Sequence, residues 1–259
     1  MLQAGTAAAI AVARTFKPWA LVSGLSSEPR PNRIGTGEPA LSLAEAVGPQ
    51  GRVVATDLVP QMLEAARQNA AARGLNNIEF RMADAEALPF SDGEFDRVTC
   101  RFGIMFFPNI PKAMEEIRRV LKPAGRVCFA VFGTLEENPV FLVTLGPFLK
   151  RVKMPPPPPD APHIFRFADQ TKLRNALSSA GFRDVSTDKQ RITFAWPGPP
   201  EECWEATREL AAPFKKLIQA IPPGQTEEVI REVLDGVRCF QTGGHVNLPA
   251  TVIVATGSA

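Results

Sequence analysis

The stretch GTGEPALSLAEAVGPQGRVVATD, residues 35–57, places a glycine turn, a helix and a short strand in direct succession. Pro39 suits the first turn of a helix and Gly48 suits its end, so the sequence predicts a helix between them. The apolar run that follows is rich in β-branched residues and ends at Asp57. This order is typical of an α/β unit in which a strand ends in an acid at the edge of a sheet.

The same alternation of helix and strand continues to about residue 135. Apolar residues at helical spacing predict helices over 60–74 and 111–125, and β-rich runs predict strands at 78–84, 95–100 and 126–132. Strands that alternate with helices of this length form βαβ units. The sequence therefore predicts an α/β fold with a mostly parallel sheet.

Beyond residue 135 this rhythm breaks. An apolar helical segment precedes the polyproline run PPPPPD, and a second helix follows that run. Two β-like runs come next, at 186–196 and 250–257, and a largely helical insertion separates them. The mildly apolar N-terminal run AGTAAAIAVARTF is interpreted as a helix. We predict a single domain over 1–259, with a core and three cap segments. The core comprises about 35–135, 168–198 and 248–257, and the caps comprise about 1–25, 137–167 and 200–242.

The composition indicates which kinds of binding partner this chain is expected to lack. The 259 residues are 45% hydrophobic and 22% charged with a net charge of +2, as in a globular protein without a dominant nucleic-acid surface. No apolar run is long enough to predict a membrane span. The four cysteines lie far apart with no CxxC pair, which favours free thiols in a reducing cytoplasm and predicts no metal site.

Three polar residues follow successive predicted strands. Asp57 can accept hydrogen bonds from ribose hydroxyls, or it can be a charge near a helix N-terminus. Asp84 can accept from an exocyclic amine of adenine while Ala85 supplies a backbone N–H, or it can be a turn residue. Arg101 ends the next strand and either faces the same crevice or is a surface charge.

These pieces together resemble the class I S-adenosylmethionine-dependent methyltransferases, in particular the ubiquinone/menaquinone-type small-molecule enzymes. The resemblance runs from about Gly35 to Phe132, through GTGEPALSLAEAV, ADAEALPFSDGEFDRVTC and AMEEIRRVLKPAGRVCFAVFG. It implies a Rossmann-like methyltransferase fold with an antiparallel C-terminal strand. It also implies S-adenosyl-L-methionine as cofactor. The residues implied to bind it are Gly35 and Gly37 at the methionine part, Asp57 at ribose, Leu58 and Met62 near adenine, Asp84 with Ala85, and Arg101.

The chain departs from this family just before the glycines. An apolar strand is expected there, but the sequence has Pro29 and Pro31. Proline cannot donate to a strand ladder and is confined to edges or strand beginnings. We therefore expect the first strand to be missing or distorted.

The resemblance implies methyl transfer to a small molecule, and the apolar cap favours an apolar or aromatic acceptor. No catalytic residue is assigned, since the cofactor carries the electrophile; His163 is either a loop residue or a base or substrate contact. Two alternatives remain open. One is a non-catalytic or degenerate methyltransferase-like protein. The other is a nicotinamide-dependent oxidoreductase, because GTGEPA also satisfies G-x-G-x-x-A.

Overall fold

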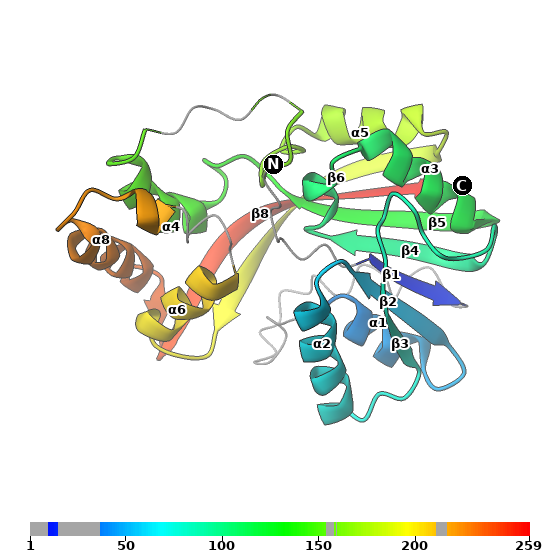
Figure 1. The fold of residues 1–259 in the computed structure, drawn as a ribbon, viewed down its shortest axis with the longest axis horizontal. Helices are drawn as coiled ribbons and strands as arrows, with labels where there is room; N and C mark the ends of the chain where they lie inside the picture. The colour runs from blue at the N-terminus through cyan, green and yellow to red at the C-terminus, as the bar shows by residue number, and fades with distance from the viewer. Residues whose placement is uncertain (1–9, 15–36, 154–157, 159, 211–216) are drawn as a thin grey trace.

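The computed structural model describes residues 10–14, 37–153, 158, 160–210 and 217–259, with the backbone alone at 10–14 and 209–210. Its centre is an eight-stranded sheet of order β3-β2-β1-β4-β5-β8-β6, with β7 paired to β8 (Figure 1). The strands are β1 (Ile10–Arg14), β2 (Arg52–Asp57), β3 (Ile78–Met82), β4 (Phe95–Arg101), β5 (Leu121–Phe132), β6 (Arg183–Trp196), β7 (Gln241–Thr242) and β8 (His245–Ser258).

Most strands of this sheet point the same way. Strands β2 and β3 are parallel, as are β4 and β5, while β8 runs antiparallel to both β5 and β6. The predicted mostly parallel sheet with an antiparallel C-terminal strand is thereby confirmed. Since the carboxyl ends of β2, β3, β4 and β5 share one edge, the residues that follow them are brought together there.

Strand β1 lies between β2 and β4 and runs antiparallel to both. The interpretation of AGTAAAIAVARTF as a helix, and the placement of 1–25 in a cap, are therefore wrong for residues 10–14. The alanines of this run favour a helix, but Ile10 and Val12 are β-branched, and pairing on both sides outweighs local propensity. The expected first strand is thus replaced by a strand of reversed direction. Pro29 and Pro31 lie outside the described residues.

Helices cover the two faces of the sheet. Helices α1 (Ala40–Val47) and α2 (Pro60–Ala72) pack beside β2, where Val53 and Ala55 join the cluster under α1. On the other face, α3 (Ile110–Val120) packs on β5, and α5 (Gln170–Ser179) packs on β6 and β8 beside α3. The central strands of the sheet therefore lie between two helical layers, as expected for an α/β fold.

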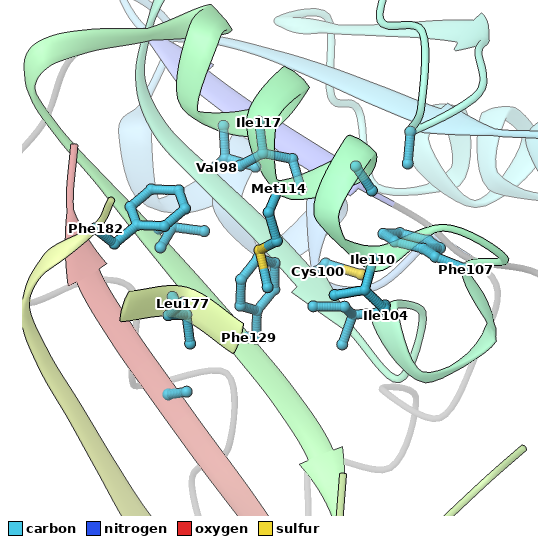
Figure 2. Close-up of a cluster of buried hydrophobic side chains, with 14 of the residues drawn as sticks. Val98, Cys100, Ile104, Phe107, Ile110, Met114, Ile117, Phe129, Leu177 and Phe182 are labelled. Carbon is cyan, nitrogen blue, oxygen red and sulfur yellow. The ribbon is translucent and has the colours of Figure 1, made fainter. Parts of the chain in front are cut away.

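The main core lies under α3 and α5. Figure 2 shows Met114 and Ile117 of α3 pointing toward Val98, Phe129 and Leu177, all of them buried. The predicted helix over 111–125 ends early, at Val120, and Leu121 already pairs with Phe95 as the first residue of β5. The reason is Pro123, because a residue that precedes proline is driven toward extended conformations.

A second hydrophobic cluster lies at the far end of β6 and β8 (Figure 1). It is built by α4 (Pro139–Leu149), α6 (Pro200–Leu210) and α8 (Thr226–Arg238), around buried Phe148, Trp204 and Val233. The insertion predicted as largely helical is confirmed as such. Among the described residues, no helix has the length and hydropathy needed to cross a bilayer. The division of one domain into core and cap segments stays a prediction.

Candidate cofactor site

The two predicted acids lie at neighbouring strand ends. Asp57 is the last residue of β2 and is in register with Met82, the last residue of β3. The backbone carbonyl of Asp57 accepts a hydrogen bond of 3.3 Å from the N–H of Ala83, which directly precedes Asp84. The parallel pairing of β2 and β3 thus brings both carboxylates to one edge of the sheet.

Asp57 is a buried carboxylate with a fixed orientation. Its residue is 3% exposed, and Oδ1 accepts a 2.8 Å hydrogen bond from the backbone N–H of Val59. Burial raises the pKa of Asp57, and the backbone hydrogen bonds of Val59 and Leu58 oppose this shift. The local geometry follows from the sequence, because the turn between β2 and Pro60 at the start of α2 aims these N–H groups at the acid.

Asp84 differs because its side chain is exposed. Its Oδ1 accepts a 2.9 Å hydrogen bond from the N–H of Glu86, and a bridge links it to Ala87, so it also shapes the turn that follows β3. The next residue, Ala85, is buried in the core under α3. The alternatives for Asp84, turn residue and ligand acceptor, are therefore compatible.

Two large apolar side chains are exposed beside these acids. Leu58 is 57% exposed and Met82 is 64% exposed, while Met62 is half-buried in the first turn of α2. Leu58 was singled out in the sequence, whereas Met82 was missed because it reads as an ordinary strand residue. An exposed apolar pair beside two acceptors can bind a flat heterocycle with polar edges.

The turn after β3 is held by α3. Arg119 donates to the carbonyl oxygens of Leu88, at 2.9 Å, and Phe90, at 2.8 Å, while Glu116 accepts from the N–H of Leu88 at 2.8 Å. A hydrogen bond from Arg119 also lowers the pKa of Glu116. This ion pair keeps the backbone that follows Asp84 in place.

The second glycine of the turn has a conformation and surroundings that require glycine. Gly37 has φ +107°, and a Cβ there would lie 3.0 Å from Cδ1 of Leu41 and 3.1 Å from Cβ of Ala66. The adjoining Glu38 is buried and bound by Arg73 at 2.9 Å and by the Ser42 hydroxyl at 2.6 Å. Gly35 lies outside the described residues.

Arg101 reaches the same edge from β4. Burial lowers the pKa of its guanidinium, and the negative charge of Glu38 opposes that shift. The guanidinium lies 5.7 Å from the ring centroid of Phe102. The interpretation of Arg101 as a plain surface charge does not fit this half-buried position.

A chain of partly exposed aromatic rings continues from Phe102 along the edge. Phe102 stacks on Phe132 at 4.1 Å, Phe132 meets Phe141 of α4 edge-on at 4.8 Å, and Phe141 meets Phe165 at 5.3 Å. Phe194 of β6 lies 6.2 Å from both Phe102 and Phe132. We call these five rings the aromatic cluster. Phe141 and Phe165 lie in the cap segment predicted at 137–167, whereas Phe102 and Phe132 adjoin or end a strand at the predicted edge.

His163 lies in the loop that carries Phe165. Its Nδ1 accepts a 3.2 Å hydrogen bond from the N–H of Phe165, and burial, followed by the charges of Lys172 and Arg166, lowers its pKa. A neutral imidazole that accepts at Nδ1 carries its proton on Nε2, so in this arrangement it offers a donor and not a base. Buried Arg166 ties this loop to the carbonyl of Phe107 at 2.5 Å.

The edge of the sheet thus holds two acids, an exposed apolar pair and a glycine turn, all within one continuous segment. Residues 32–152 match the model of the ubiE/COQ5 methyltransferase family. This segment, just under half of the chain, is similar to that family. The resemblance read from the sequence is confirmed, and this ubiE/COQ5-type segment contains every residue predicted to bind the cofactor.

Curated relatives agree with this assignment. The demethylmenaquinone methyltransferase of Thermus thermophilus is 47% identical over 113 residues, which are 42% of this chain and 50% of the relative. The ubiquinone/menaquinone biosynthesis C-methyltransferase UbiE of Brucella abortus is 41% identical over 124 residues, which are 45% of this chain and 46% of the relative. The chain therefore spans about half the length of the curated relatives it matches.

Solved structures show the fold. The YcgJ protein of Bacillus subtilis superposes with a TM-score of 0.51 at 22% identity, over 86% of this chain and 88% of that chain. The BH2331 protein of Bacillus halodurans superposes with a TM-score of 0.52 at 22% identity over the same shares. The predicted Rossmann-like fold is confirmed. The role of each predicted residue in cofactor binding stays a prediction.

Proposed function

We propose that this chain transfers a methyl group from S-adenosyl-L-methionine to a ring carbon of a small, quinone-type aromatic molecule. The observation that carries the proposal is the placement of Asp57 and Asp84 at adjoining strand ends, within the segment that matches the ubiE/COQ5 family. The named activities of the curated relatives support the acceptor class, since both act on ubiquinone or menaquinone precursors by name.

The side chains at this edge suit the parts of the cofactor. In the proposed complex, Asp57 accepts from the ribose hydroxyls, while Leu58 and Met62 contact adenine, with Met82 beside them. Asp84 accepts from the exocyclic amine and Ala85 offers its backbone N–H. Gly37 allows close approach of the backbone at the methionine part, because a side chain there has no room. Gly35 is proposed for the same role.

The acceptor in this proposal lies against the aromatic cluster. Phenylalanine rings provide a flat apolar surface for another ring, at distances typical of stacked and edge-on pairs. Because these five rings come from β5, β6, α4, the loop at 165 and the residue that follows β4, they can surround a ring and exclude water. Orientation and desolvation are the contributions that a methyl transfer needs from the protein.

When bound, the cofactor supplies the electrophilic methyl group. In the transfer, the acceptor carbon would gain that methyl as the bond from the methyl to the sulfonium sulfur breaks, and its ring proton would pass to water. The chain would hold both partners in line. Two donors, Nε2–H of His163 and the guanidinium of Arg166, lie in the loop next to the aromatic cluster. They suit an acceptor that carries oxygen atoms on its ring.

A calorimetric titration with S-adenosylhomocysteine tests the proposal. We expect binding in the micromolar range, and transfer of labelled methyl from the cofactor to a reduced naphthoquinone that lacks its ring methyl. Binding of a reduced nicotinamide dinucleotide in place of S-adenosylhomocysteine would overturn the proposal in favour of an oxidoreductase.

A second candidate, a methyltransferase-like protein without activity, is favoured by one observation. The central strand β1 runs opposite to its neighbours, so its carboxyl end lies at the other edge of the sheet from the carboxyl ends of β2 and β4. The strand therefore does not lead directly into the glycine turn. If neither ligand binds, this second candidate is the one to retain.

A further inference from the structure

Arg101 and Asp57 occupy equivalent positions on the two strands that flank β1. Thr56 and Cys100 are both in register with Ile10, so the residues that follow them, Asp57 and Arg101, lie one step nearer the carboxyl edge. Side chains alternate along a strand, and Val54, Val98 and Cys100 face the core under α3. Asp57 and Arg101 therefore emerge on the opposite face, which is the face that α1 covers.

The spacing of these two residues matches an elongated ligand. Two strand-to-strand steps separate β2 from β4, which amounts to about 10 Å. A ligand whose ribose lies at Asp57 and whose long axis crosses β1 therefore reaches Arg101 with its other end. Gly37 and Glu38, at the start of α1, adjoin the same region, since the charge of Glu38 acts on Arg101.

The charge of Arg101 lacks a dedicated partner in the described part of the chain. There, no hydrogen bond and no ion pair within 4 Å involves its guanidinium, which contacts the ring of Phe102. The carboxylate of Glu38 is already bound by Arg73 and Ser42. A cation withdrawn from water without a paired anion is unfavourable, so this position favours an anionic ligand group.

We propose that Arg101 binds the carboxylate at the methionine end of the cofactor. The planar guanidinium presents parallel N–H donors that match a carboxylate. This inference rests on the proposed function and adds to it the ligand group that Arg101 recognises. Arg101 would anchor the amino-acid end, and Asp57 the adenosine end.

Two ligands separate these roles. S-adenosylhomocysteine carries the carboxylate, whereas 5′-methylthioadenosine has the same nucleoside and thioether without the amino-acid end. We expect R101Q to weaken S-adenosylhomocysteine binding roughly 10- to 100-fold, as for a lost hydrogen bond to a charged group, and to leave 5′-methylthioadenosine within about twofold. R101K should give an intermediate loss, and Asp57→Asn should weaken both ligands alike.

The outcomes distinguish this inference from the function on which it rests. In one outcome, both ligands bind the native chain while R101Q weakens the two equally or leaves both unchanged. In that case Arg101 does not bind the carboxylate, and the proposed adenosine site is unaffected. If the native chain binds neither ligand, the proposed function fails and the inference fails with it. Thermal unfolding checks that R101Q is folded. If it is not folded, R101K is the test variant, and a loss of S-adenosylhomocysteine affinity without a loss of 5′-methylthioadenosine affinity supports the inference, whereas equal losses contradict it.

Discussion

Asp57 shows how a position proposed to bind a ligand can act against stability. Burial is the largest influence on its carboxyl and raises its pKa above the ordinary value of 3.8. An acid whose pKa is higher in the folded state than in the unfolded state destabilises the fold once it is ionised. That penalty is absent below pH 3.8, where both states are protonated, and it develops as the pH rises through the folded pKa.

We therefore expect Asp57→Asn to raise the melting temperature at pH 7 and to weaken S-adenosylhomocysteine binding. The amide oxygen of asparagine can still accept from the N–H of Val59, so the turn is retained. The gain in melting temperature should shrink as the pH falls toward 3.8. Scanning calorimetry over that range measures it, and a lower melting temperature at pH 7 would contradict the assignment.

Gly37 allows a second test at this scale. Gly37→Ala should destabilise the chain by about 1–3 kcal/mol, because alanine is strained at φ +107° and its Cβ meets Leu41 and Ala66. Gly74→Ala is the matched control, since φ is +67° there but no atom lies within 4 Å of the added Cβ. Urea unfolding should show the larger loss for Gly37→Ala. Equal losses would mean that the turn is not packed between α1 and α2.

At the scale of elements, β1 is the unusual feature. It fills the central position of the sheet while running against both neighbours, so its five residues join β2 and β3 to the rest of the sheet. Edge strands tolerate the loss of a backbone donor, but a strand paired on both sides does not.

Val12→Pro tests the central position of β1. Val12 is in register with both Val54 and Val98, so proline would remove a ladder donor in the middle of the sheet and leave its acceptor unpaired, a loss of about 1–3 kcal/mol. Val12→Ile keeps the N–H and an apolar, β-branched side chain and serves as the control. Circular dichroism during denaturant unfolding measures both variants. An unchanged midpoint for Val12→Pro would show that residues 10–14 are not a central strand.

At the scale of the whole molecule, the aromatic cluster joins the two hydrophobic cores. Phe132 ends β5 and Phe102 directly follows β4, whereas Phe141 belongs to α4, which packs with α8 in the second cluster. An acceptor bound among these rings would contact both parts of the chain, while the nucleoside would contact only the sheet and its helices.

This arrangement predicts a separation of effects in Phe141→Leu. We expect the acceptor KM to rise about 2- to 10-fold, since one aromatic contact contributes about 0.5–1.5 kcal/mol, while the Kd of S-adenosylhomocysteine stays unchanged. Leu142→Ala, at a 45% exposed position of the same helix, is the control and should alter neither value. An equal loss of S-adenosylhomocysteine affinity would place Phe141 in the cofactor site and contradict its assignment to the acceptor site.

Much of the fold follows from local patterns. The helix after Gly37, the strands that end at Asp57 and Arg101, and the helical insertion after residue 200 were all predictable, since periodicity and turn residues act over a few residues. Local patterns also brought Asp57 and Asp84 to one edge, because parallel strands share their carboxyl ends.

Other features were not predictable from local patterns. Phe102, Phe132 and Phe194 form a cluster only because β4, β5 and β6 end in one region, and nothing in their own neighbourhoods marks them as partners. Within the residues that the structure describes, Arg101 has no paired carboxylate because Glu38 is bound by Arg73, which lies 35 residues further along the chain than Glu38.

The sequence by itself determined the order of helices and strands and the acids at the strand ends, because these depend on side-chain periodicity and on short-range turns. Only the tertiary structure decided that residues 10–14 form the central strand, and in which direction. The physical reason is that an extended run has the same local preferences in either direction, so the hydrogen bonds to β2 and β4 select its place and its orientation.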